Sequence, residues 1–590
     1  MAQYKLSDYI AKRLKEYHNV ERFFMVSGGG AMHLNDSLGR YIPYTANHHE
    51  QACAIAAEGY ARVNQRLAVV NVTTGPGGLN CLNGVFGQWT DSAPVLYISG
   101  QVKYTTTMSS CPELPLRQLG DQEVDIISVV KPLTKYAKMV TEPKEIKYHL
   151  DRAIYEATTG RKGPVWLDIP MNVQAAIIEE DELIDFEKPQ AVAYEYNMSA
   201  IVDKIKNAKR PLIISGHGIR LAGKIEEFEQ FVNKTHIPVV GTFNGCDILP
   251  TTNQYNMGKI GTIGQRAGNF VLQNADLVLC LGTRNNIRQA SYNWENFAKN
   301  ATKIVVDIDN AELQKPLVKP DVAVNADLKD FIPELSSQLN GYVANEEWVK
   351  HCQNLKDKYS FEKHPEHIQK ENIINPYYFT KILMSKLGKD DTLVSANATP
   401  SICIFQIGDF NGQRVIMNSG DASMGYGLPS AIGAYYQTKG RTIAFEGDGS
   451  IMMNIQELQT IAHNKLPIKI FIINNQGYSS IRQSQKNFFN GNMTGSGKDS
   501  GVSVPDFVEV GKAFGIKSIK IDNPKTMEVE IDKVLSINEP ILCEVMVEDD
   551  YIFAPKLSAR KLPDGTMVSP SLEDMYPFLD RDEFEGNICK

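Results

Sequence analysis

The chain has 590 residues, of which 43% are hydrophobic, and a formal net charge of −8. This length exceeds what one hydrophobic core can organise and predicts about two to four domains. The weakly acidic balance offers no basic surface for nucleic acid, so we expect no nucleic-acid partner. No apolar run of about 18 residues occurs, which predicts that the chain does not act in or on a membrane.

Nine cysteines are scattered singly along the chain, without a CxxC pair. An odd count without metal-binding spacing favours a reducing compartment and no structural zinc. The amino terminus lacks the apolar core of a secretory signal. The sequence therefore predicts a cytoplasmic protein.

Short β-rich runs alternate with helical segments, which predicts parallel sheets covered by helices. Three such blocks follow one another, so the expected fold class is α/β, with three consecutive doubly wound parallel-sheet domains. The predicted domains are residues 1–180, 191–335 and 365–550, followed by a tail at 551–590. The tail is rich in proline and acidic residues, and we expect a lid or a surface wrap.

In the first block, Glu50 follows a short strand at 42–46 and begins an apolar helix. A carboxylate in the first turn of a helix is common because it interacts favourably with the helix dipole. Taken alone, Glu50 is interpreted as an acidic residue that stabilises the start of a helix. Two glycine-containing turns in the same block, at 27–30 and 73–80, each follow a predicted strand.

The most informative stretch lies in the third block, where a buried strand runs into Gly447-Asp448-Gly449-Ser450 and a second strand ends at Asn474-Asn475. The glycines let backbone amides approach phosphate oxygens, and the following helix adds its positive end. Asp448 and Asn475 supply hard oxygen ligands, which suit a Mg²⁺ ion on a diphosphate. An isolated Asp-Gly pair is usually a turn, but the full pattern favours a diphosphate site.

This pattern, with Glu457 and Leu466-Pro467 between its halves, resembles the diphosphate motif of thiamine diphosphate (ThDP) enzymes, and its interior is similar to the acetolactate synthase branch. The three blocks are similar to the pyrimidine-binding, central and diphosphate-binding domains of that superfamily. The resemblance implies that Mg²⁺ is held by Asp448, Asn475 and the backbone carbonyl of Gly477, and that Gly449 and Ser450 contact the diphosphate.

The segment around Glu50, with Glu-Gly-Tyr-Ala-Arg at 58–62, resembles the glutamate motif of the family. The resemblance implies that Glu50 faces the pyrimidine N1′ and promotes the imino tautomer, which takes the proton from thiazolium C2. It also implies a catalytic contribution from the backbone of Gly29. The remaining cofactor contacts that it implies are Thr74, Asn80 and Met424.

The stretch from Gln118 to Lys135 resembles the acetolactate synthase segment that borders the substrate pocket. It implies a catalytic role for Gln122 and substrate contacts from Asp121 and Lys135. Members similar to pyruvate decarboxylase carry a histidine pair in this region, and residues 103–121 contain no histidine. Asp121 stands where acetolactate synthases carry phenylalanine, which makes the pocket more polar and leaves the acceptor open.

The central block carries Gly282-Thr283-Arg284, similar to the flavin loop of acetolactate synthases. The resemblance implies FAD without a redox role, contacts from Arg284 and Asp309, and Arg288 near the substrate channel. Ile287 stands where the family carries an acidic residue, and the neighbouring Asn285 and Asn286 also differ from the family pattern. The alternative is a vestigial domain whose arginines are surface ion-pair partners.

The resemblance implies a ThDP- and Mg²⁺-dependent carboligase, a transferase that decarboxylates pyruvate and passes a two-carbon hydroxyethyl or acetyl unit to a carbonyl acceptor. The acceptor is a 2-keto acid or a keto-deoxysugar nucleotide. A non-ligating 2-keto acid decarboxylase and an FAD-dependent pyruvate oxidase remain alternatives. A regulatory subunit without chemistry is disfavoured because the acid and the metal ligands are present. Since the outer domains of this superfamily meet across subunits, we expect a homodimer or homotetramer.

Overall fold

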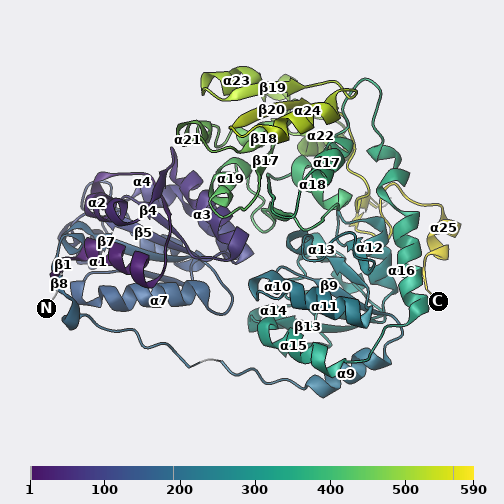
Figure 1. Cartoon of the computed structure of the whole chain (residues 1–590), viewed down its shortest axis with the longest axis horizontal. Helices are drawn as coiled ribbons and strands as arrows, with labels where there is room; N and C mark the ends of the chain where they lie inside the picture. Colours follow the sequence, from purple (N-terminus) through teal and green to yellow (C-terminus); the bar gives the residue numbers. More distant parts are fainter. Residues whose placement is uncertain (1–2, 191, 562–563, 590) are drawn as a thin grey trace.

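The computed structural model describes residues 3–190, 192–561 and 564–589, which form three α/β domains (Figure 1). Within these residues each domain contains one six-stranded parallel sheet flanked by helices. The predicted fold class is therefore confirmed. None of the described helices is both long and apolar enough to cross a bilayer.

The first domain has the strand order β3-β2-β4-β5-β7-β6. Its central strands β4 and β5 are buried along their whole length, because helices cover both faces of the sheet. The strands are β2 (Phe23–Met25), β3 (Tyr44–Ala46), β4 (Ala68–Val72), β5 (Val95–Gln101), β6 (Tyr136–Met139) and β7 (Val165–Pro170). The main helices are α1 (Leu6–Lys12), α2 (Met32–Tyr41), α3 (Glu50–Asn64), α5 (Leu82–Asp91) and α7 (Ile146–Thr158).

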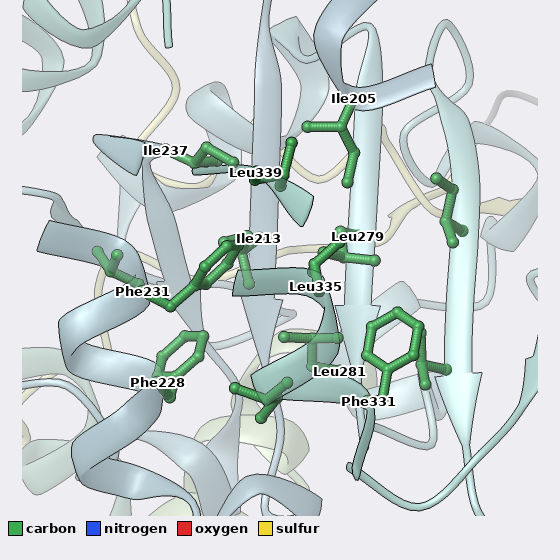
Figure 2. Close-up of a cluster of buried hydrophobic side chains, with 14 of the residues drawn as sticks. Ile205, Ile213, Phe228, Phe231, Ile237, Leu279, Leu281, Phe331, Leu335 and Leu339 are labelled. Atoms are coloured by element: carbon green, nitrogen blue, oxygen red, sulfur yellow. The ribbon is translucent and has the colours of Figure 1, made fainter. Parts of the chain in front are cut away.

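The second, central domain has the order β11-β10-β9-β12-β13-β14. Figure 2 shows its core, where phenylalanines of α11 and α15 pack on aliphatic side chains of β9 and β12. The strands are β9 (Pro211–Ser215), β10 (Val239–Gly241), β11 (Asn256–Lys259), β12 (Leu277–Leu281), β13 (Thr302–Asp307) and β14 (Val322–Asn325). The main helices are α9 (Met198–Asn207), α11 (Ile225–Thr235), α12 (Arg266–Asn274), α15 (Leu328–Gln338) and α16 (Glu346–Lys358).

The third domain has the order β16-β15-β17-β18-β20-β19, which repeats that of the first domain when the strands of each are numbered along the chain. The strands are β15 (Thr392–Ser395), β16 (Arg414–Met417), β17 (Thr442–Gly447), β18 (Lys469–Asn474), β19 (Lys517–Ile521) and β20 (Ile541–Met546). The main helices are α17 (Pro376–Ser385), α18 (Thr399–Ile407), α19 (Gly427–Tyr435), α20 (Asp448–Ile451), α21 (Glu457–His463), α22 (Ser479–Phe488), α23 (Phe507–Ala513) and α24 (Met527–Ser536).

The first and third domains contact each other through α3 and α19, which lie side by side. Glycines make this approach possible: a Cβ at Gly59 would lie 2.0 Å from the carbonyl oxygen of Ser430, and one at Gly433 would lie 1.7 Å from that of Ala56. The carboxylate of Glu457 adds a polar bridge, because it accepts from the Asn47 side chain at 2.8 Å. The helix that begins at Glu50 is therefore fixed against the third domain.

The tail after β20 runs back over the central domain, where α12 and α16 hold it (Figure 1). Buried amide side chains of α12 donate to tail carbonyl oxygens: Asn269 to Leu572 at 3.0 Å and Asn274 to Asn587 at 2.7 Å. Arg266 donates to the carbonyl of Pro577 at 2.7 Å. The tail is thus docked on the central domain, and its role as a lid or a surface wrap stays a prediction. The domain boundaries themselves remain a prediction.

Candidate active site

Each sheet has a switch point. There, two neighbouring strands are followed by connections that run to opposite faces of the sheet. These pairs are β2 and β4 in the first domain, β9 and β12 in the central domain, and β15 and β17 in the third. Loops leave such a pair in opposite directions, so a crevice opens at the carboxyl ends of the strands, where ligands of open α/β sheets bind. Most of the residues singled out in the sequence lie at these three points.

In the first domain, the glycine loop after β2 rests on the loop after β4. A Cβ at Gly28 would lie 2.5 Å from the Thr73 side chain, and the Gly30 amide donates to Thr73 Oγ1 at 3.1 Å. A Cβ at Gly29 would meet no atom within 4 Å. Gly29 thus faces open space that the fold does not fill. Thr74 is buried, and its hydroxyl donates to the Gly100 carbonyl at 3.1 Å, which anchors the loop.

Glu50 is the first residue of α3 and is half-buried beside these loops. Its Oε2 accepts a hydrogen bond from Asn80 Nδ2 at 3.0 Å. Its Oε1 would lie 3.6 Å from a Cβ at Gly77. The fold therefore brings Glu50, Asn80 and the glycine loops together at one crevice. This agrees with the sequence-based grouping of these residues.

Gln122 reaches the same edge through its backbone. Its carbonyl oxygen would lie 1.8 Å from a Cβ at Gly75, so only glycine fits there, and Gly75 also has a φ of +61°. Asp121 and Gln122 are both exposed. Lys135 lies elsewhere: its Nζ donates to the carbonyl oxygens of Glu156 and Thr159, near the end of α7. The structure groups Asp121 and Gln122 with the glycine loops and separates Lys135 from them.

In the third domain, Asp448 begins α20 at the end of β17 and is buried. Its Oδ2 accepts from the amides of Gly477 at 2.8 Å and Asn475 at 3.1 Å, and its Oδ1 accepts from the Gly449 amide at 2.7 Å. Burial nevertheless raises the pKa of the Asp448 carboxyl to about 6. A nearby positive charge would favour its ionised form.

Asn475 follows β18 and completes this group. Its Oδ1 is buried and has no hydrogen-bond partner among the described residues, which is costly unless a ligand satisfies it. Among the described residues, no group of three acidic, histidine or cysteine side chains gathers as a metal cage. One carboxylate, one amide oxygen and a backbone carbonyl are the few protein ligands that Mg²⁺ uses when phosphate and water supply the rest. The residues present therefore fit a Mg²⁺–diphosphate group.

Three further predicted residues surround this point. A Cβ at Gly449 would lie 2.2 Å from the Tyr478 ring, so a side chain there is excluded. Ser450 Oγ accepts from the Gly425 amide at 2.9 Å, which joins α20 to the segment that contains Met424. Met424 is half-buried, and the carbonyl of Gly477 belongs to a residue with a φ of +119°. The structure brings these residues to one edge of the sheet.

The switch point of the central domain opens into a cavity of about 380 Å³ that also touches the other two domains. Arg284 and Arg288 line it, and burial lowers the pKa of Arg288. Asp309 is absent from its described lining. That side chain accepts from the Ala311 amide at 3.0 Å and pairs with Arg161 at 2.8 Å.

Sequence reasoning missed several side chains of this cavity. Asp307 at the end of β13 lines it, and burial raises the pKa of that carboxyl to about 6. His217 lines it with a buried Nε2 that has no hydrogen-bond partner within residues 3–190, 192–561 and 564–589. Asp307 at the end of β13 and His217 after β9 both lie at carboxyl ends of strands. This position in the sequence could have indicated that they line a ligand site. Arg161 lies on the other side, in the first domain, and no local motif marks it.

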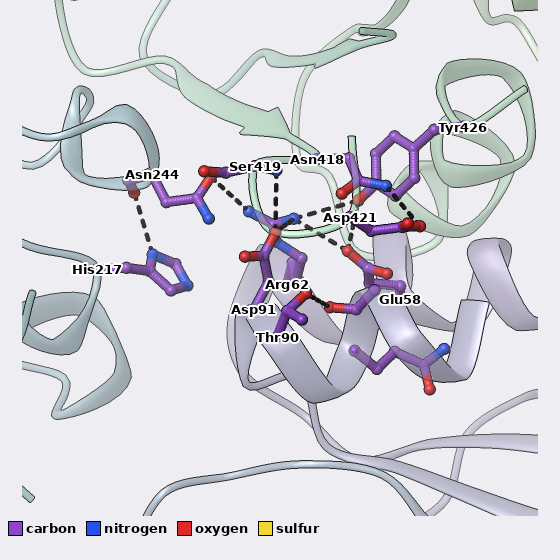
Figure 3. Close-up of polar contacts among 12 residues, drawn as sticks. Glu58, Arg62, Thr90, Asp91, His217, Asn244, Asn418, Ser419, Asp421 and Tyr426 are labelled. Atoms are coloured by element: carbon purple, nitrogen blue, oxygen red, sulfur yellow. Dashed lines mark hydrogen bonds and ion pairs between the residues drawn. The ribbon is translucent and has the colours of Figure 1, made fainter. Parts of the chain in front are cut away.

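A buried polar network borders the cavity and joins all three domains (Figure 3). Arg62 of α3 is 2% exposed and donates to Glu58 at 3.0 Å and Asp91 at 3.3 Å in its own domain. It also donates to Tyr426 of the third domain and to Asn244 of the central domain, each at 3.3 Å. Removing the Arg62 side chain would leave several buried polar groups without hydrogen-bond partners.

The three α/β domains carry switch-point crevices of the kind at which phosphate-containing ligands bind. Family models match each domain: the thiamine pyrophosphate enzyme N-terminal TPP binding domain at residues 4–129, the central domain at 198–335 and the C-terminal TPP binding domain at 401–545.

Curated relatives match over nearly the whole chain. An acetolactate synthase large subunit of Lactococcus lactis is 32% identical, over 94% of this chain and 94% of the relative. The acetolactate synthase isozyme 2 large subunit of Escherichia coli is 30% identical, over 90% of this chain and 93% of the relative. A probable acetolactate synthase large subunit of Methanococcus aeolicus is 30% identical, over 94% and 93%. The chain therefore belongs to the ThDP enzyme family and is an enzyme of the acetolactate synthase type.

Proposed function

We propose that the chain is a Mg²⁺-dependent carboligase that decarboxylates pyruvate and joins the two-carbon unit to a second carbonyl compound. One observation carries this proposal. A glutamate beside an open glycine loop and a buried Asp–Asn pair lie at corresponding switch points of two sheets with the same strand order. Relatives named acetolactate synthases support the same chemistry.

ThDP, when bound, supplies a nucleophilic carbon that adds to the keto group of pyruvate and accepts the electrons released with CO₂. The Glu50 carboxyl would serve as the acid–base group at the aminopyrimidine end of the cofactor, while Asn80 fixes the carboxyl through its hydrogen bond. The backbone of Gly29 leaves room for the reacting atoms, and the turn at Gly75 lets the Gln122 backbone approach closely. Closure of this crevice by a second copy of the chain would favour capture of the second carbonyl over protonation by water.

Asp448, Asn475 and the carbonyl of Gly477 would hold Mg²⁺, and Gly449 and Ser450 would contact the diphosphate. The support is the buried, unpartnered Asn475 Oδ1 and the raised pKa of Asp448, since a divalent cation satisfies both.

The central cavity would hold FAD without a redox role. The β11-β10-β9-β12-β13-β14 order is the arrangement that binds dinucleotides at its switch point. Arg284, Arg288 and Arg161 supply positive charge for a diphosphate, and Asp307 supplies an acceptor for ribose hydroxyls. Asn285 is not free for this purpose, because it is buried and accepts from Gln289 at 3.2 Å. The departure at Asn285 therefore places a contact inside the protein, while Asn286 still lines the cavity.

A second copy of the chain would complete the active site. Exposed apolar side chains directly follow the site loops of both outer domains: Met32 (50% exposed) and Leu79 (38%) in the first, Met452 (41%) and Met453 (48%) in the third. Apolar groups beside a polar crevice indicate a surface that is covered in an assembly. We propose a homodimer or homotetramer in which Glu50 of one copy serves the diphosphate site of another. A cytoplasmic location also remains part of the proposal.

The acceptor is either a second 2-keto acid or a keto-deoxysugar nucleotide, and exposed Asp121 favours a polar one. The test incubates the protein with ThDP, Mg²⁺ and pyruvate, with and without each acceptor, followed by mass spectrometry. A hydroxyketone product is expected. Free aldehyde alone would indicate the decarboxylase alternative, and oxygen uptake with peroxide would indicate the oxidase.

A further inference from the structure

The first residues of the tail enter the diphosphate site. Tyr551 directly precedes the docked part of the tail, is only 4% exposed, and packs its ring edge-on against Phe553 with centroids 5.4 Å apart. The carbonyl of Tyr551 accepts from Gln483 of α22 at 3.1 Å. The position of this tyrosine is therefore fixed by contacts on two sides.

The hydroxyl of Tyr551 contacts the metal-site amide. Asn475 Nδ2 donates to Tyr551 Oη at 3.2 Å, and its second neighbour, Thr399 Oγ1, lies at 3.5 Å, the limit for a hydrogen bond. Thr399 and Tyr551 also hydrogen-bond each other. The amide nitrogen is thus occupied on the tail side, while Oδ1, on the other arm of the same amide, is buried without a partner in the part of the chain that the structure describes.

We infer that Tyr551 is a positioning residue that orients the Asn475 amide so that Oδ1 points at the cation. This inference rests on the proposed Mg²⁺–diphosphate site. An asparagine amide is nearly symmetric in shape, and its two ends differ only in their hydrogen bonding. Without the hydroxyl, Nδ2 keeps only the long contact to Thr399, and the rotated amide would present N–H groups to a cation. The tail thereby contributes to the metal site as well as wrapping the central domain.

Tyr551→Phe tests the inference because it removes the hydroxyl and keeps the packed ring. The measurement is ThDP binding by calorimetry at a series of Mg²⁺ concentrations. We expect the half-saturating Mg²⁺ concentration to rise about five- to tenfold, the effect of one lost hydrogen bond on a buried group. Melting of the metal-free protein should stay within about a degree of the parent. The control Tyr576→Phe removes another tail hydroxyl and should leave the Mg²⁺ requirement unchanged.

An Asn475→Ala background separates positioning from a direct effect. Once Asn475 lacks its amide, the added Tyr551→Phe change should shift the Mg²⁺ requirement no further, whereas additive losses would contradict the inference. Asp448→Ala identifies which claim has failed. If Asp448→Ala raises the Mg²⁺ requirement and Tyr551→Phe does not, the role of Tyr551 is wrong. If neither does, the proposed metal site is wrong, and the inference falls with it.

Discussion

The first and third domains share one sheet topology but carry different chemistry at corresponding edges. In the first domain, the strand pair at the switch point ends in glycine loops beside Glu50, a half-buried acid with one oxygen held by Asn80. In the third, it ends in Asp448, a buried carboxylate held by three backbone amides. One edge suits proton chemistry and the other suits a cation, although the backbone framework is the same.

The difference shows that topology places the crevice and that burial decides what the carboxylate does. A half-buried acid can exchange a proton, whereas a buried carboxylate with amide donors fits a metal. The central domain sharpens this point, because its different strand order accompanies a third kind of site lined by arginines. Variants at each edge should therefore fail in different ways.

The largest expected effect is that of Glu50→Gln on turnover. Replacing the Glu50 carboxyl by an amide removes the acid–base group of the first domain. The turnover rate should fall at least about a hundredfold, the lower end of general acid–base contributions. ThDP binding by calorimetry and the melting temperature should stay near parent values, because Glu50 contributes one part-exposed hydrogen bond. The exposed Glu21→Gln is a matched control. Retained turnover in Glu50→Gln would remove the distinction between the two edges.

Asp448→Ala should show the opposite profile. Loss of the buried carboxylate should weaken Mg²⁺-dependent ThDP binding on the order of ten- to a hundredfold, the range seen when metal-site partners are removed. Excess Mg²⁺ and ThDP should restore part of the turnover, which they cannot do for Glu50→Gln. Titration of both ligands against turnover measures this. An unchanged Mg²⁺ requirement would contradict the metal assignment.

How much of this the sequence could predict differs between the edges. The GDG and NN pattern is local, so Asp448 and Asn475 could be assigned from their spacing. Glu50 alone is typical of an ordinary helix N-terminus. Its catalytic role could be predicted only from the similarity of its segment to a family motif. Lys135 was assigned to the pocket because it matches a position of the family; its ammonium donates to carbonyl oxygens at the end of α7, and its substrate contact stays a prediction.

Long-range contacts were beyond the sequence for a physical reason. Tyr551 reaches Asn475 across 76 residues, and Arg161 reaches Asp309 across 148. Neither contact has a periodic or local signal, because tertiary packing alone creates it. Asp309 was named from its similarity to a family strand end, and its cofactor contact stays a prediction; the described cavity lining contains Asp307, the last residue of β13, and not Asp309.

A pH effect on stability should mark the first domain. Asp168 in β7 is fully buried and accepts from Ser99 at 2.6 Å, and burial raises the pKa of its carboxyl to about 7. The folded pKa lies above the unfolded value of 3.8, so this group favours folding at low pH, and that contribution is lost as pH rises through 7.

Relative to Asp168→Asn, the parent should therefore gain about 2 to 3 kcal/mol between pH 8 and pH 5. Thermal melting of both proteins across this range measures the difference, with the exposed Asp181→Asn as control. A constant gap between parent and Asp168→Asn would show that the carboxyl titrates normally.

The smallest expected effect concerns strain at the third-domain edge. Ala398 precedes α18 with a φ of 55° and a ψ of −125°, a conformation that suits glycine and strains other residues. Ala398→Gly should raise stability by about 1 kcal/mol, whereas Ala153→Gly inside α7 should lower it by at least as much. The melting temperatures of the two variants measure these changes in stability. A lower melting temperature for Ala398→Gly would contradict backbone strain at Ala398.

The central claim is that the two edges meet between copies of the chain, and mixing two inactive variants tests it most directly. Glu50→Gln and Asp448→Ala chains are combined by co-expression and assayed at limiting Mg²⁺ and ThDP, where each alone should have little activity. In a mixed dimer, one of two sites would receive both intact residues. With half of the dimers mixed, activity should return to about a quarter of the parent level, as a twofold-symmetric assembly requires. No recovery in dimers shown to be mixed would place both residues of each site in one chain and contradict the account.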